Sequence, residues 1–169
     1  PGLLDERFAC APVEWRTGGN AIAEVANRWE CDSRWSFFAL ENDLALRESG
    51  KAAALWSKRG YTGDVDVDLW VGNKMERGRG SNYSYARDIN VTIGSDGADL
   101  TKGYTFMFGG FDNRGSMILR NGQVVKEWPL QIVRDNSHHN LWYTIHVEKH
   151  GNRLTFRVDK DLNAPQPGS

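Results

Sequence analysis

The chain has 169 residues, a formal net charge of −1, and no apolar run near the roughly 18 residues that a membrane-spanning helix needs. These properties allow one domain with a sizeable core, and they exclude a general electrostatic attraction to nucleic acid or anionic lipid. The sequence starts with Pro1-Gly2 and shows no signal peptide, so we expect a processed segment of a larger protein. Seven tryptophans and 18 glycines favour an all-β domain with tight turns and aromatic contact surfaces.

Residues 1–33 form an N-terminal segment that we expect to pack on the rest of the domain. Within it, GNAIAEVANRWE (19–30) repeats apolar residues at helical spacing and is the one candidate for a short helix, with an irregular segment as the alternative. Cys10 and Cys31 are the only cysteines, too few for a zinc site of their own. They predict a disulfide if the protein is exported, and the alternative is two buried thiols in a cytosolic protein.

From residue 34 onward, short apolar runs of strand length recur with turn signals between them. The predicted strands cover 34–40, 52–58, 64–72, 89–95, 104–110, 116–120, 123–128, 141–149 and 152–159. RNGQ (120–123) and KHGNR (149–153) join asparagine to glycine, the composition of tight hairpin turns. The pattern predicts an all-β fold of two antiparallel sheets, a β-sandwich over residues 34–161, with 162–169 as a tail or linker.

The long polar loop at residues 73–88 interrupts this series of strands and is a candidate functional loop. Its basic part, KMERGRG (74–80), lacks the broad stripe and interleaved aromatic residues that nucleic-acid binding requires. We therefore expect no nucleic-acid partner.

Alternation within the strands separates an apolar inner face from a mixed outer face. The predicted inner rows are Val65, Val67, Leu69 and Val71; Ile89, Val91 and Ile93; Tyr104, Phe106 and Phe108; Tyr143, Ile145 and Val147; and Leu154, Phe156 and Val158. The opposite parity carries acids, bases, amides and tryptophans, whereas an ordinary solvated face favours Lys, Glu and Thr. We expect five of these outer side chains to converge on one ligand-binding face: Asp68, Trp70, Arg120, Trp142 and His146.

A face of this kind suits a sugar. Flat aromatic rings cover the apolar side of a pyranose, while carboxylates, amides and guanidinium groups bond its hydroxyls. The alternative is that a loop or a neighbouring domain covers both tryptophans.

The stretch TGDVDVDLWVG (62–72) raises the separate question of a calcium site, because it opens like an EF-hand loop. That loop needs glycine at its sixth position and glutamate at its twelfth, where this chain has Leu69 and Met75. We therefore predict a half-buried strand whose Asp66 and Asp68 share no calcium ion. The Asp/Gly turns at 94–99 and 109–115 are an alternative location for calcium, and otherwise we expect no metal and no cofactor.

The runs WSFFAL, AAALWSKR and GDVDVDLW, followed by LWYTIHVEKHGNRLTFRVD, resemble a concanavalin A-like lectin/glucanase domain. Within that superfamily the chain is similar to the bacterial 3-keto-disaccharide hydrolase group and to laminin-G-like modules. The resemblance covers residues 34–160 and implies a jelly-roll sandwich, usually secreted, that binds or acts on glycans. It departs from the family in two ways, because residues 7–35 have no counterpart and the strands that normally follow the last hairpin are missing.

The resemblance favours a carbohydrate-recognition module of a larger secreted, periplasmic or cell-surface bacterial protein. The alternatives are a glycan-active hydrolase and a structural sandwich that packs against another domain or subunit. The candidate catalytic residues are Asp66, Asp68, His146 and Glu148, as a carboxylate pair or an imidazole–carboxylate acid/base pair. Laminarinase-type members carry E-x-D-x-x-E on one strand, and the corresponding DVDVDL has no glutamate, so the sequence leaves catalysis open.

Overall fold

The computed structural model describes residues 4–5, 14–16, 27–31, 36–40, 54–72, 88–97, 99–110, 115–129 and 141–161. Every named element is a β-strand and every strand pair is antiparallel, which confirms the predicted all-β class. Among these described residues no helix is long and apolar enough to cross a membrane. The chain divides into two compact units, one of residues 1–61 and 95–102 and one of residues 62–94 and 103–169.

The first unit contains two short strand pairs. In one, β1 (Trp15–Arg16) pairs with β4 (Trp56–Ser57), and in the other, β2 (Asn27–Cys31) pairs with β3 (Ser36–Leu40). The predicted helix over 19–30 is therefore wrong at its C-terminal end, and residues 19–26 lie outside the described part. A lone helix of this length is marginal without packing, so the ladder to β3 outweighs the weak helical pattern.

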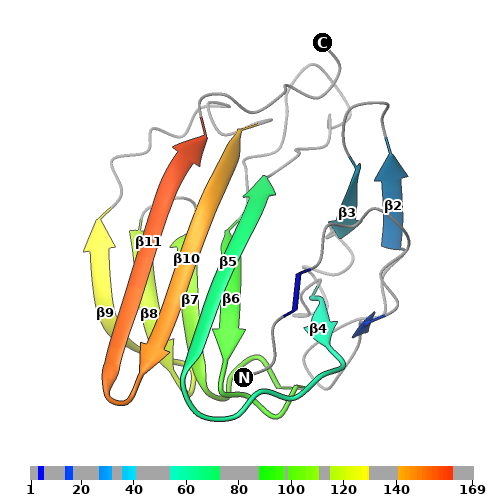
Figure 1. Cartoon of the computed structure of the whole chain (residues 1–169). Helices are drawn as coiled ribbons and strands as arrows, with labels where there is room; N and C mark the ends of the chain where they lie inside the picture. The colour runs from blue at the N-terminus through cyan, green and yellow to red at the C-terminus, as the bar shows by residue number, and fades with distance from the viewer. Residues whose placement is uncertain are drawn as a thin grey trace. The chain divides into compact units, whose positions relative to one another are not determined.

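The second unit contains the sandwich. One sheet has the order β11-β10-β5, from β5 (Val65–Gly72), β10 (Trp142–His150) and β11 (Arg153–Asp161). The other has the order β6-β7-β8-β9, from β6 (Ile89–Ile93), β7 (Tyr104–Gly109), β8 (Gly115–Arg120) and β9 (Gln123–Pro129). Figure 1 shows the first sheet lying in front of the second. The unit that holds both sheets starts at residue 62.

The core lies between the two sheets and consists of rows that alternation predicts, with Ile118 of β8 in addition. Its buried members are Ile89, Ile93, Phe106, Ile118, Tyr143, Ile145 and Val147. The apolar side of β5 and that of β11 pack against them, together with Val91, Tyr104 and Phe108. Phe106 of one sheet contacts Phe156 of the other edge to face, with ring centroids 5.6 Å apart. Because these rows are buried, the alternate side chains of β5, β10 and β11 lie on the opposite, outer face of the sheet.

Two hairpin turns fix the register of the strands as their composition predicted. Asn121 and Gly122 both adopt positive φ, at 48° and 77°, as a type I′ turn between β8 and β9 requires. Gly151 adopts a φ of 54° at the first central position of the β10–β11 turn, which matches a type II′ turn. The second turn sets the pairing of β11 with β10, and thereby the β11 neighbours of the outer side chains on β10.

Candidate functional site

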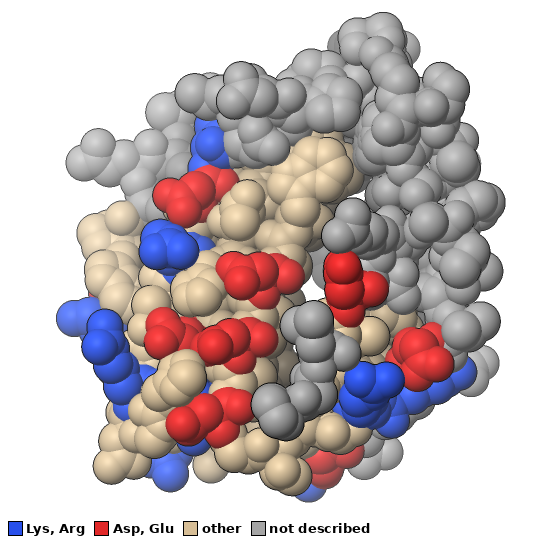
Figure 2. All heavy atoms as spheres, viewed as in Figure 1, with Lys and Arg blue, Asp and Glu red and all other residues tan. Residues whose placement is uncertain are grey.

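The outer face of the β11-β10-β5 sheet gathers a row of acids and imidazoles. Along β5 the aspartates are exposed while the intervening valines and leucine turn inward. The register places Asp68 opposite His146 and Asp66 opposite Glu148. Figure 2 shows acidic side chains in a line over these strands, with basic ones along the β11 side. We call this set the acid–imidazole row; its members are Asp64, Asp66, Asp68, His146, Glu148 and His150.

His146 lies between two carboxylates. Its Nδ1 is 2.7 Å from Asp68 Oδ1 and its Nε2 is 3.5 Å from Glu148 Oε2. The hydrogen bond to Asp68 is the main reason why the pKa of His146 is raised above its ordinary value of 6.5. The imidazole is 19 % exposed, and its contact with Asp68 ties β10 to β5.

His150 lies four residues further along β10 and also faces carboxylates. Its Nε2 is 2.9 Å from Asp66 Oδ1 and 3.5 Å from Glu148 Oε1, and its Nδ1 is 3.4 Å from Asp64 Oδ2. The hydrogen bond to Asp66 raises the pKa of His150. The backbone N–H of Gly151 donates to Asp64 Oδ1 at 2.8 Å and lowers the pKa of that carboxyl.

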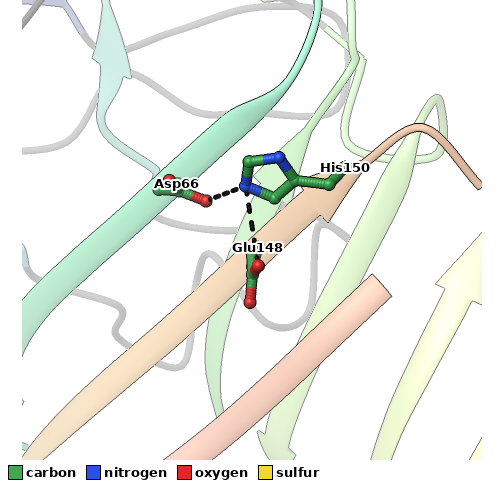
Figure 3. A group of neighbouring side chains, drawn as sticks. All are labelled: Asp66, Glu148 and His150. Atoms are coloured by element: carbon green, nitrogen blue, oxygen red, sulfur yellow. Dashed lines mark hydrogen bonds and ion pairs between the residues drawn. The ribbon is translucent and has the colours of Figure 1, made fainter. Parts of the chain in front are cut away.

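Three members of the row are close enough to share a metal ion. One ligand atom from each of Asp66, Glu148 and His150 lies within 4.8 Å of the others. Figure 3 shows Asp66 reaching across from β5 and His150 reaching back toward Glu148 on β10, with the His150 nitrogen facing both carboxylates. Carboxylate oxygen and imidazole nitrogen are common ligands of divalent transition ions.

The two tryptophans on this face have different environments. Trp70 is 41 % exposed and stacks on Trp142, with centroids 4.2 Å apart and planes at 19°. Trp142 is only 9 % exposed, although its strand parity is that of the outer face. Its ring packs over Gly72, where an added Cβ would lie 3.1 Å from Trp142 Cδ2. Trp70 therefore offers surface to a ligand, whereas Trp142 supports it from the covered side.

Arg120 does not join these residues, which corrects the expectation that five outer side chains converge on one face. It lies at the end of β8 in the other sheet, opposite Tyr104, and its guanidinium sits 5.7 Å from the centre of that ring. The error has a physical cause, because β8 is apolar on both parities and Met117 and Ile118 are both buried. Ile118 pairs with Phe106, a core residue, so its side chain lies on the core side of the sheet. Arg120, two residues further along β8, has the same parity as Ile118.

The four candidate catalytic residues share this face, and their electrostatics bear on what they can do. The Glu148 carboxyl has a lowered pKa, first because of a hydrogen bond from Thr155. A glycosidase general acid needs a raised pKa. The pKa values of Glu148 and Asp64 are lowered instead, which is the wrong direction for that role. The His146–Asp68 pair has hydrogen-bond geometry suited to proton transfer.

The predicted site residues omit two members of the row, Asp64 and His150, because their role depends on strand pairing. The signal was in the sequence, since Asp64 continues the alternation of Asp66 and Asp68, and His150 continues that of His146 and Glu148. Only the pairing of β5 with β10 brings the two series together. Two other predicted features lie outside the described residues. They are Cys10 and the loop at 73–88, of which only Asp88 is described, whereas Cys31 lies on β2.

Comparisons of the chain with protein-family models, curated proteins and solved structures found no match. The resemblance to concanavalin A-like domains therefore stays a prediction, while the two-sheet sandwich stands on the structure.

Proposed function

We propose that this domain is a carbohydrate-recognition module whose binding face is the outer side of the β11-β10-β5 sheet. The observation that carries the proposal is Trp70, an indole that stays 41 % exposed in line with a row of hydrogen-bonding side chains. A flat aromatic ring covers the apolar side of a pyranose at small entropic cost, because only two side-chain torsions must be fixed.

The polar partners of a sugar stacked on Trp70 come from the neighbouring positions. Thr144 is directly opposite Trp70, and the His146–Asp68 pair is the next outer pair along the same two strands. Carboxylate oxygens accept hydrogen bonds from sugar hydroxyls, and an imidazole N–H donates one. On His146 that group is Nε2, whose contact with Glu148 is the longer of its two, at 3.5 Å. The three residues we assign to ligand binding are therefore Asp68, Trp70 and His146, with Trp142 as the support of the platform.

The charge of the row narrows the ligand class. The acid–imidazole row contains four carboxylates, and an anionic sugar would approach them against like charge. Neutral or amino-bearing oligosaccharides should therefore bind better than uronate-containing or sulfated ones.

We place the module in a larger secreted, periplasmic or cell-surface bacterial protein, an inference that rests on the family resemblance alone. The same resemblance keeps two other functions as outcomes of the test, a glycan-active hydrolase and a sandwich that packs on another domain.

The proposal is tested on an array of neutral, amino-bearing and acidic oligosaccharides, followed by calorimetric titration of the oligosaccharide with the strongest signal. Trp70→Ala should weaken binding by about 1–3 kcal/mol, or about 5- to 150-fold. The matched control is Trp128→Ala, because Trp128 is 40 % exposed on β9 of the other sheet. That variant should bind like the parent.

Three outcomes would count against the proposal. Equal losses in the Trp70→Ala and Trp128→Ala variants would move the site elsewhere, and no signal from any sugar would favour a structural role for the face. Cleavage of the array sugar, lost in His146→Gln or Glu148→Gln, would establish a hydrolase instead.

A further inference from the structure

The acid–imidazole row contains an arrangement that sugar binding does not use. Asp66, Glu148 and His150 converge on one point at the end of the row, where His150 begins the turn to β11, on the far side of Asp68 and His146 from Trp70. We propose that these three side chains form a binding site for a divalent first-row transition ion, with Zn²⁺ as the representative. This site goes beyond carbohydrate recognition and does not depend on it.

The distances among the three ligand atoms suit such an ion. Tetrahedral zinc with bonds of about 2.1 Å separates neighbouring ligand atoms by about 3.4 Å. His150 Nε2 lies 2.9 Å from Asp66 Oδ1 and 3.5 Å from Glu148 Oε1, and all three atoms lie within 4.8 Å. The three side chains are partly exposed, so small rotations would bring them onto one ion and leave a coordination position for water.

Two further residues hold the ligands in the orientation that an ion needs. Asp64 Oδ2 faces Nδ1 of His150, and the Gly151 N–H fixes Asp64 from behind. A carboxylate on the second nitrogen is the usual partner of a metal-binding histidine, because it holds the proton there and frees Nε2 for the ion. His146 Nε2 faces Oε2 of Glu148, which leaves Oε1 of the same carboxylate turned toward His150.

The ligand set selects the class of ion. Two carboxylates and one neutral imidazole carry two negative charges, which a divalent ion balances. Imidazole favours zinc, cobalt, nickel and copper, while calcium and magnesium prefer oxygen-only sites with more ligands. Zinc should therefore bind more tightly than manganese, and calcium should bind weakest.

The site is tested by titrating the untagged chain with Zn²⁺ alone, with no sugar present, so that the result is independent of carbohydrate binding. We expect one ion per chain. The ring-nitrogen NMR signals of His150 should show coordination through Nε2 and a retained proton on Nδ1. Coordination through Nδ1, or through other histidines only, would overturn the proposal.

Variants separate the ligands from the residues that orient them. Loss of a residue that orients a metal ligand typically lowers metal affinity by roughly 10- to 100-fold. His150→Ala removes a ligand itself and should lower zinc affinity by more than that, whereas Asp64→Asn should lower it by about 10-fold. The control is Asp159→Asn, which removes a carboxylate from the same face. The Oδ2 atom of Asp159 lies 3.4 Å from Arg157 Nε. This control variant should leave the affinity unchanged, and circular dichroism should show that all three variants fold.

No binding at about 1 mM Zn²⁺, a free energy near −4 kcal/mol, would refute the site. Equal binding by His150→Ala would refute it too.

Discussion

Removal of the supporting tryptophan should cost the fold more than removal of the exposed one. Trp142 buries about nine tenths of its surface and Trp70 about three fifths. Truncation of a fully buried tryptophan to alanine costs about 3–5 kcal/mol of unfolding free energy. Scaled by the buried share, Trp70→Ala should cost about 2–3 kcal/mol, and Trp142→Ala should approach the full range.

The stack between the two rings adds a coupling that a double-mutant cycle isolates. Aromatic pairs contribute about 0.5–1.5 kcal/mol beyond burial, and these rings lie 4.2 Å apart nearly in parallel. The double variant should therefore lose less free energy than the two single variants together, by about that amount.

Urea unfolding of the four proteins, followed by circular dichroism, measures each free energy and checks that the slope is unchanged. A smaller cost for Trp142→Ala than for Trp70→Ala would refute the assignment of Trp142 as the support. Strict additivity would show that the stack contributes nothing.

Two further predictions concern the core and the row. Ile145 is fully buried on β10, so Ile145→Ala should cost about 2–5 kcal/mol of unfolding free energy, whereas Thr144→Ala beside it should stay within about 0.5 kcal/mol; equal urea midpoints would contradict the parity of β10. The ring-proton NMR titration of His146 should have its midpoint above 6.5, and Asp68→Asn should move it down. Because the folded pKa is the higher one, this group stabilises the fold below about pH 6.5 and its contribution disappears as the pH rises through the folded value; an unshifted midpoint would contradict the contact.

The inner rows could be predicted because β5, β6, β7, β10 and β11 are half-buried strands. Most of their residues alternate, and alternation of period two assigns each side chain to a face. The turn at Asn121 and Gly122 was predictable for a local reason too, since these residues tolerate positive φ.

Alternation could not predict the face of a residue on a strand that is buried on both sides, nor the pairing of strands that are far apart in the chain. On β8 both parities are apolar, so the sequence could not say which face Arg120 shares. Trp142 has outer parity and is nevertheless buried, because Trp70 and Gly72 make room for its ring. The meeting of β5 with β10 depends on contacts between residues far apart in the chain, and local propensity carries no information about them.

The most direct measurement of the central claim is an amide and indole NMR titration of the parent chain with the oligosaccharide that binds best on the array. We predict that the indole N–H of Trp70 shifts, together with amides of Asp68, Thr144 and His146, while the indole N–H of Trp128 stays in place. Shifts confined to β6 to β9, or a Trp128 signal that moves while Trp70 does not, would contradict the assignment of the β11-β10-β5 face as the carbohydrate-binding surface.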